Sequence, residues 1–148
     1  MDEKMFDELM DSLYVAKEIT HVFPNLPEGI KLSYLYVLYA ISKLGENVRI
    51  TDISKEMLIS SPNITALVNE IEKKGFVMRE RSKTDKRVSY ITSTNKGKEI
   101  LDKYYLQYKK EVASSIDISE EDLMTTIETL NQLKKYFVDA SDKMNKEQ

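Results

Sequence analysis

The sequence predicts a mainly α-helical protein with one small β-hairpin. Only four of the 148 residues are Gly and three are Pro, a supply of turn formers too small for a large all-β fold. Most apolar residues recur at helical spacing, but between Phe76 and Ser93 two β-prone segments enclose a polar turn. The length fits one domain, and the 41% of hydrophobic residues can form a core.

Two helices are expected in the first third of the chain. The first runs from residue 3 to about residue 22 and ends at the segment 24–29, because two prolines and a glycine cannot continue a hydrogen-bonded helix. The second covers Leu32–Leu44, is almost wholly apolar or aromatic, and ends at Gly45. Such a composition predicts a helix that is buried on most sides. The stripe of the first helix comprises Phe6, Leu9, Leu13, Ala16 and Thr20.

Two short helical segments joined by a tight turn come next and predict a helix-turn-helix. Thr51 is a suitable N-cap for a helix over residues 52–58, whose inward residues would be Ile53 and Met57. The second helix starts at two serines and Pro62, whose missing N–H costs little in a first turn, and it stops at the glycine at position 75. Its inward face would consist of Ile64, Leu67, Val68 and Ile71.

A hairpin and two long helices complete the expected fold. Residues 76–81 and 88–93 predict strands around a polar, mostly basic turn at residues 82–87. Thr94 would cap the first long helix, and Ser119 would begin a helix that reaches about Phe137. The apolar and aromatic residues of these helices are Ile100, Leu101, Tyr104, Tyr105, Tyr108 and Val112, then Leu123, Ile127, Leu130, Leu133 and Phe137.

The charge of the chain is unevenly distributed. Residues 48–98 carry 11 Lys/Arg and 6 Asp/Glu, a local charge of +5, whereas the remainder carries 11 and 19, a charge of −8, within a net charge of −3. A basic middle between acidic flanks is typical of a segment that faces phosphate. A chance asymmetry of the surface is the alternative interpretation.

Several function classes are poorly supported. Without cysteine and with one histidine, the chain lacks the usual means for a metal site, thiol chemistry or acid–base catalysis, so we expect no metal, no cofactor and no enzymatic activity. No apolar run is long enough to cross a membrane, so no membrane partner is expected. The N-terminus lacks the basic start and apolar stretch of a secretory signal, and a cytoplasmic location is therefore expected.

Several motifs resemble the multiple-antibiotic-resistance regulator (MarR) family of winged helix-turn-helix transcriptional regulators. Residues 53–57 and 64–77 are similar to its helix-turn-helix, and Asp85-Lys86-Arg87 matches the Asp-x-Arg of its wing. The family's Leu-Thr-x-x-Gly start of the next helix stands here as Ser93-Thr94-Asn95-Lys96-Gly97, with serine in place of leucine. The likeness is weaker near residues 30–38, where Lys31 and Tyr34 occupy positions at which Thr and Gln are common.

This resemblance implies a single MarR-like domain over residues 1–148. A winged-helix DNA-binding lobe would occupy about residues 31–98, and residues 1–23 and 99–148 would form dimerisation helices. It further implies a homodimeric, sequence-specific regulator that binds double-stranded DNA at a pseudo-palindromic operator, with repression as the expected sign. Arg87 would enter the minor groove, and Asp85 would hold the shape of the wing.

The residues themselves also suit a DNA-binding role. A major groove admits one helix, which must be polar on its outward face. Serines beside the helix N-terminus can donate to phosphate, and cations at a hairpin tip suit phosphates or a narrow minor groove. A solvated helix and a solvated tip are the alternative, as is a winged helix that binds protein instead of DNA. The candidate DNA-binding residues are Ser60, Ser61, Asn63, Thr65, Ala66, Asn69, Lys73, Lys83, Asp85, Lys86 and Arg87.

The phenol-rich helices offer a second candidate site. In MarR-like proteins small aromatic acids or phenols bind between the DNA-binding and dimerisation parts, so the resemblance implies a small aromatic or phenolic effector. The candidate residues for binding it are His21, Tyr39, Tyr104 and Tyr108. A tyrosine-rich core in which each hydroxyl is satisfied locally is the alternative that we favour.

Overall fold

A computed structural model describes residues 1–147 of the chain. It forms two compact units, residues 1–108 and the part that begins at Lys109. The structure confirms the predicted mainly helical class with one antiparallel hairpin. The elements of the first unit are α1 (Glu3–Ile19), α2 (Leu32–Leu44), α3 (Ile50–Met57), α4 (Ser61–Lys73), β1 (Val77–Arg81), β2 (Ser89–Ser93), α5 (Asn95–Leu101) and the π-helical turn η1 (Asp102–Leu106).

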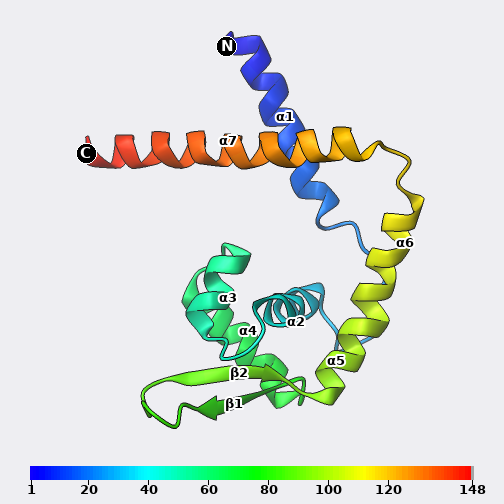
Figure 1. Ribbon diagram of the computed structural model, residues 1–148, viewed down its shortest axis with the longest axis vertical. Helices are drawn as coiled ribbons and strands as arrows, with labels where there is room; N and C mark the ends of the chain where they lie inside the picture. The colour runs from blue at the N-terminus through cyan, green and yellow to red at the C-terminus, as the bar shows by residue number, and fades with distance from the viewer. Residues whose placement is uncertain (148) are drawn as a thin grey trace. The chain divides into compact units, whose positions relative to one another are not determined.

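Helix α2 lies at the centre of the first unit (Figure 1). It contacts α3, α4, α5 and β2, as its almost wholly apolar sequence predicted. Leu35, Val37 and Leu38 are fully buried in it. The helix ends at Gly45, whose positive φ of +83° is one that glycine adopts without strain. Ile53, Ile64, Val68, Ile71, Phe76, Val77 and Ile91 complete the core around it.

The hairpin has a third, very short partner that sequence reasoning did not foresee. Val77 pairs with Ser93 and Arg81 with Ser89, so the turn comprises the seven residues between the strands. The amide of Ile91 donates to the carbonyl oxygen of Val48 at 2.7 Å, and this bridge ties the segment before α3 to β2. The buried side chains of Val48 and Ile91 thus join the hairpin to the core.

The boundaries of the helix-turn-helix agree with the prediction except at the start of α3. Thr51 was expected to cap this helix, but it lies inside the first turn, and Arg49 occupies the N-cap position. The reason is Asp52, whose carboxylate accepts the backbone N–H of Arg49 at 2.9 Å and so begins the helix earlier. Helix α4 starts after Ser60 and is followed by Gly75 at a φ of +76°, as expected.

The second unit consists of the end of α6 (Gln107–Ser115) and α7 (Glu120–Lys146). The hydroxyl oxygen of Ser119 accepts the N–H of Asp122 at 3.1 Å, which confirms the predicted start of α7. The helix continues nine residues beyond the predicted end at Phe137. Between residues 1 and 147, no helix combines the length and apolarity needed to cross a bilayer.

The start of α5 is held against the end of α4 by a compact hydrogen-bonded corner. Thr94 caps α5 as predicted: its Oγ1 accepts the N–H of Gly97 at 3.1 Å and donates to the carbonyl oxygen of Gly75 at 2.6 Å. A Cβ atom on Gly97 would lie 2.1 Å from the carbonyl oxygen of Phe76, so only glycine fits there. The neighbouring Ser93, which replaces the family's leucine, has a buried Oγ without a partner among the described residues.

We expect Gly97→Ala to destabilise the fold by roughly 1–3 kcal/mol, because either α5 or the backbone of Phe76 must move to admit the methyl group. Urea denaturation followed by circular dichroism would measure the loss. Lys98→Ala, an exposed position in the same helix, is the matched control and should change stability little. Equal midpoints for wild type and Gly97→Ala would contradict the close approach.

Candidate nucleic-acid interface

The inward and outward faces of helix α4 are those predicted, except at Thr65. Ile64, Val68 and Ile71 are fully buried, and Leu67 is half-buried against the core. Asn63, Ala66, Asn69 and Lys73 are exposed. Thr65 was expected to point outward, but it is half-buried and its hydroxyl donates to the carbonyl oxygen of Ser61 at 2.9 Å. Its hydroxyl proton is therefore engaged within the helix and is a weaker candidate for contacting a base.

The N-terminus of α4 leaves polar groups available beside this face. The first hydrogen bond of the helix runs from the amide of Ile64 to the carbonyl oxygen of Ser60, at 3.0 Å. Ser60 occupies the N-cap position and its hydroxyl makes no capping bond. The N–H groups of Ser61 and Asn63 thus precede the first helical bond, and such groups attract anions such as phosphate.

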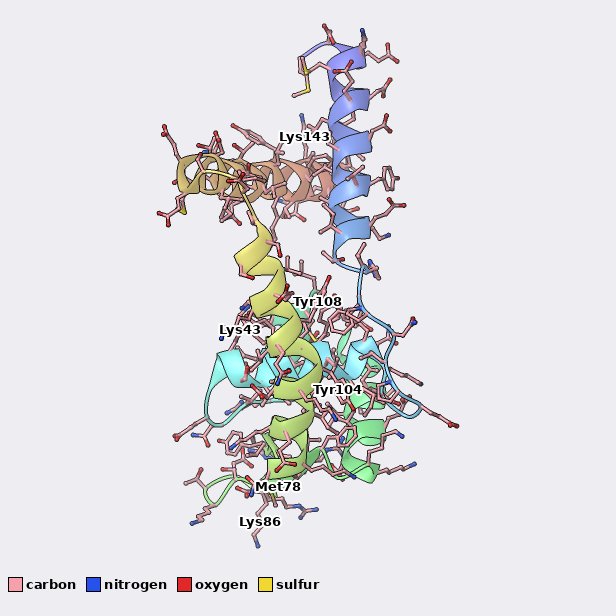
Figure 2. The ribbon with its side chains drawn as sticks, turned by 90° about the vertical axis from the view of Figure 1, so that its right-hand side faces the viewer. Lys43, Met78, Lys86, Tyr104, Tyr108 and Lys143 are labelled. Carbon is pink, nitrogen blue, oxygen red and sulfur yellow. The ribbon has the colours of Figure 1, made fainter. Side chains whose placement is uncertain are left out.

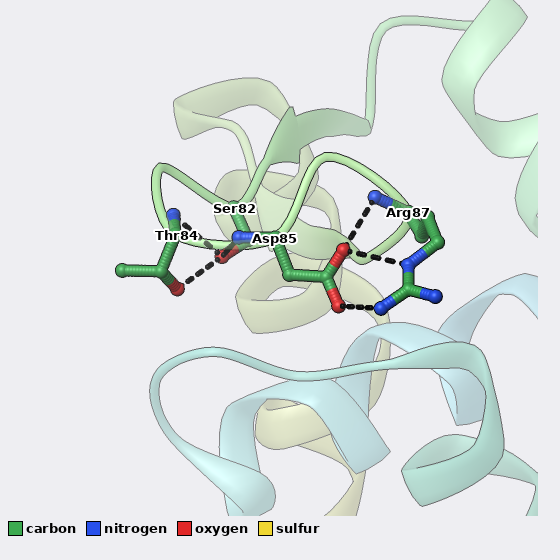
Figure 3. A network of polar contacts seen from close by, with 4 residues as sticks. All are labelled: Ser82, Thr84, Asp85 and Arg87. Carbon is green, nitrogen blue, oxygen red and sulfur yellow. Dashed lines mark hydrogen bonds and ion pairs between the residues drawn. The ribbon is translucent and has the colours of Figure 1, made fainter.

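The turn of the hairpin is shaped by a buried serine, which sequence reasoning missed (Figure 3). Ser82 Oγ accepts the backbone amides of Thr84 and Asp85, both at 3.3 Å, and lies 3.1 Å from the hydroxyl oxygen of Thr84. A further bond of 3.0 Å runs from the amide of Val88 to the carbonyl oxygen of Asp85. These contacts fold residues 82–88 into a compact tip.

Asp85 and Arg87 form a bidentate ion pair on this tip (Figure 3). The carboxylate accepts Nε and Nη2 of Arg87 at 3.1 and 3.2 Å and its backbone amide at 3.0 Å. These bonds from Arg87 lower the pKa of the Asp85 carboxyl group. Because the Arg87 side chain is 90% exposed, the pair adds little stability. Its effect is to hold the direction of the guanidinium group.

The remaining predicted wing residues are solvent-facing cations. Lys83 and Lys86 are exposed, and Figure 2 shows Lys86 extending away from the ribbon of the hairpin. Together with Arg87 they concentrate positive charge on a turn that follows directly from the strand next to α4. The geometry is that of a polar helix face accompanied by a cationic hairpin tip.

Arg79 of β1 is a further cation beside α4. The sequence analysis included it in the charge of residues 48–98 but did not predict its position. Its Nη2 donates to Oδ1 of Asn69 at 2.5 Å, and its Nε lies 3.2 Å from the carboxylate of Glu72. The guanidinium group therefore lies against the outward side of α4 and covers one of its carboxylates. The alternation along the strand indicated that Arg79 and Arg81 share a face, but not which helix residues they would meet.

A second network, also missed, joins α2 to the opposite flank of α4. The hydroxyl of the buried Tyr34 donates to Oε2 of Glu70 at 2.5 Å, and Nζ of Lys31 lies 3.3 Å from the same oxygen. These two donors lower the pKa of Glu70, and the bond to Glu70 raises the pKa of Tyr34. Lys31 and Tyr34 are the residues at which the sequence departs from the MarR pattern.

Two of the candidate effector residues lie in an aromatic cluster. Tyr39 and Tyr108 belong to an aromatic cluster with Phe23, Tyr36 and Tyr105, in which ring centroids lie 4.5–6.2 Å apart. The hydroxyl of Tyr108 donates to the carbonyl oxygen of Val22 at 2.9 Å, and that of Tyr36 to Thr20.

The other two effector candidates have different surroundings. The ammonium group of Lys103 lies 5.2 Å from the ring centroid of Tyr104. Nδ1 of His21 lies 2.9 Å from the carbonyl oxygen of Lys17 on an exposed turn. The hydroxyls of Tyr34, Tyr36 and Tyr108 each donate to a local acceptor, and the effector site stays a prediction.

The fold and the site define a winged helix-turn-helix protein of the class that binds DNA and regulates transcription. The sequence profile of the MarR family matches residues 28–88. The HTH-type transcriptional regulator SarZ of Staphylococcus saprophyticus is 28% identical over 139 residues, which cover 92% of this chain and 94% of the relative. Over its helix-turn-helix and hairpin the chain is therefore similar to the MarR family.

Solved structures are similar to this chain over most of its length. Streptococcus pneumoniae FabT, crystallised in complex with DNA, has a TM-score of 0.62 and 25% identity, and the match covers 93% of this chain and 99% of FabT. Staphylococcus aureus MarR in complex with salicylate and kanamycin has a TM-score of 0.68 and 21% identity, with 92% and 94% of the two chains covered. The latter likeness shows the shared fold.

We expect Tyr34→Phe to destabilise the protein by about 1–3 kcal/mol, because the Glu70 carboxylate loses a donor and the buried position keeps its shape. Urea denaturation at pH 7 would measure this, with Tyr14→Phe, an exposed tyrosine of α1, as the control.

The same network predicts a pH dependence. Since the pKa of Glu70 is lowered in the folded state, its contribution is present above the unfolded pKa and is lost as the pH falls through the folded value. The stability difference between wild type and Glu70→Gln should therefore shrink on acidification below pH 4.5, the ordinary pKa of the group. A difference that stays constant from pH 7 into this range would contradict the role of Glu70.

Proposed function

We propose that this protein is a homodimeric regulator that binds a specific double-stranded DNA sequence and represses transcription there. The single observation that supports this most is the arrangement of α4 and the hairpin. A polar, exposed helix face lies beside a turn that holds an oriented arginine and two further exposed cations. One helix fits the major groove, and a flanking basic hairpin can reach the neighbouring minor groove.

The residues divide into two roles under this proposal. Asn63, Ala66 and Asn69 face outward on α4 and would meet base edges, with alanine permitting close approach. Lys73, further along the helix, would contact phosphate. The serines at the N-terminus of α4 would position the DNA backbone through their hydroxyls and the amide groups beside them.

The hairpin of β1 and β2, which is the wing of this fold, would contribute to DNA binding through the cations of its turn. Arg87 would enter the minor groove in the direction set by Asp85, and Lys83 and Lys86 would contact phosphates. FabT, which is 25% identical to this chain, was crystallised in complex with DNA, and this supports a DNA-binding role. Binding to chromosomal DNA would place the protein in the cytoplasm.

A homodimer is proposed because both terminal helices carry apolar stripes without buried residues. No residue of α1 or of α7 is buried in the single chain, although Leu9 and Leu13 lie on the stripe of the former and Ile127 and Leu130 on that of the latter. Exposed apolar surface of this extent marks an interaction site, and a second copy is the simplest partner. Two copies related by a two-fold axis would read a pseudo-palindromic operator.

A winged helix that binds only protein is the rival function. It would be favoured by an outward apolar face on α4, but Asn63, Asn69 and Lys73 make this face polar. The curated relative SarZ is a transcriptional regulator, and the absence of enzymatic activity in this chain stays a prediction.

Release by a small aromatic or phenolic ligand stays a prediction. Its support is the aromatic cluster around Tyr39 and Tyr108 and the salicylate complex of the S. aureus MarR protein.

We expect Arg87→Ala to weaken binding to the selected duplex and to reduce the slope of log affinity against log salt by about 1, as for one lost phosphate-neutralising charge. Fluorescence anisotropy at several salt concentrations would measure both. The fold should survive because the wing tip is not part of the core.

Two further variants make this experiment specific. Arg87→Lys keeps the charge but loses the bidentate geometry with Asp85, so it should retain the salt slope and still bind more weakly. Lys98→Ala removes a cation outside the proposed interface and should leave both quantities unchanged. An Arg87→Ala variant with wild-type affinity and slope would remove this residue from the site.

The oligomeric state can be tested directly. Light scattering at micromolar concentration should give twice the chain mass of 17.2 kDa, and Ile127→Glu together with Leu130→Glu should shift it toward the single mass by placing charges on the stripe of α7. Glu128→Gln, an exposed change within the same helix, serves as the control. A monomeric wild type would refute the dimer.

A further inference from the structure

The contact between Arg79 and α4 has a consequence for how Asn69 can meet DNA. Arg79 donates from Nη2 to the side-chain oxygen of Asn69 at 2.5 Å. A guanidinium group has only donors, so the atom of Asn69 that faces it must be the oxygen, whichever way the amide would otherwise turn. The NH2 group of Asn69 is consequently turned away from Arg79, and it makes no hydrogen bond within residues 1–147.

Glu72 keeps Arg79 in this position. Its carboxylate lies 3.2 Å from Nε of Arg79, one turn along α4 from Asn69, so the arginine contacts two residues of the same helix face. The side chains of Arg79 and Glu72 are 35% and 41% exposed, and an ion pair this exposed contributes little to folding stability. What the pair does contribute is a fixed place for the guanidinium group next to the Asn69 amide.

The orientation of an asparagine amide decides which base it matches. An asparagine that recognises adenine uses both ends of its amide: the oxygen accepts from N6 and the nitrogen donates to N7. Because Oδ1 is turned toward Arg79 and already accepts one charge-assisted bond, Asn69 turns its two N–H donors outward, although the oxygen keeps a second lone pair. Guanine offers two acceptors in the major groove, N7 and O6, and therefore suits an amide that presents its donors.

We propose that Arg79 is a specificity-determining positioning residue, which holds Asn69 as a hydrogen-bond donor so that this position of α4 reads guanine rather than adenine. This inference rests on the proposed DNA-binding function. It differs from the pairing with adenine that an outward asparagine with an unconstrained amide can make.

The test is selection of binding sites from random duplexes by wild type, Asn69→Ala and Arg79→Ala. The base pair read by Asn69 is the one whose preference disappears in Asn69→Ala, and wild type should prefer guanine there. In Arg79→Ala the amide is released, so the preference for guanine over adenine at that position should fall by about tenfold, within the range that one base pair contributes. Preferences at the other positions should stay as in wild type.

Three further variants separate this role from others. Arg81→Ala removes the same charge from the same face of β1 and should lower affinity alike for all sequences, if it acts at all. Arg79→Met keeps the aliphatic stem and should show the same change of preference, which guards against misfolding of the alanine variant. In the double variant Asn69→Ala with Arg79→Ala, losing the arginine should cause no further change at that position.

Several outcomes would overturn the proposal. Wild type could select adenine opposite Asn69, both Arg79 variants could keep the guanine preference, or they could lower affinity equally for every sequence, as a merely structural role would. A change of preference on losing Arg79 in the Asn69→Ala background would show that Arg79 reads the base itself. A wild type that binds DNA but yields one of these results refutes only the inference. A wild type that binds no duplex refutes the proposed function as well.

Discussion

The burial of α2 is the constraint on which the other elements of the first unit depend. Its fully buried Leu35, Val37 and Leu38 require apolar partners on several sides, and α3, α4, α5 and β2 supply them. Helix α4 can meet this demand only by turning Ile64, Val68 and Ile71 inward, which leaves its polar face outward. The orientation of the candidate DNA-binding face therefore follows from core packing.

The carboxylates of Glu70 and Glu72 on α4 are each bound by side chains from other elements. Glu70 is covered by Tyr34 and Lys31 of the α2 region, and Glu72 by Arg79 of β1. Without these partners, the two carboxylates would add uncompensated negative charge to a helix that we propose to lie against phosphates. Their partners are donors, so the helix can keep acidic residues near its proposed binding face while the strongest positive charge is on the wing.

The local features of the fold were predictable because they depend on neighbours in the sequence. Ser119 and Thr94 cap their helices through bonds that span three residues, and Gly45 and Gly75 end helices through a backbone conformation that suits glycine. The one wrong cap, Thr51, failed for an equally local reason. Asp52 competes for the same helix start by accepting the backbone amide of Arg49, so two local signals were in conflict.

By itself the sequence determined the helical class, the hairpin, the two faces of α4 and the family motifs, since hydrophobic periodicity and capping are short-range properties. Only the tertiary structure decided which polar groups meet. Arg79 contacts Asn69 across 10 positions and Tyr34 contacts Glu70 across 36, and no periodic pattern encodes such pairs. They exist because packing around α2 brings separate elements within hydrogen-bond distance, where a buried or charged group binds whichever complementary partner the fold presents.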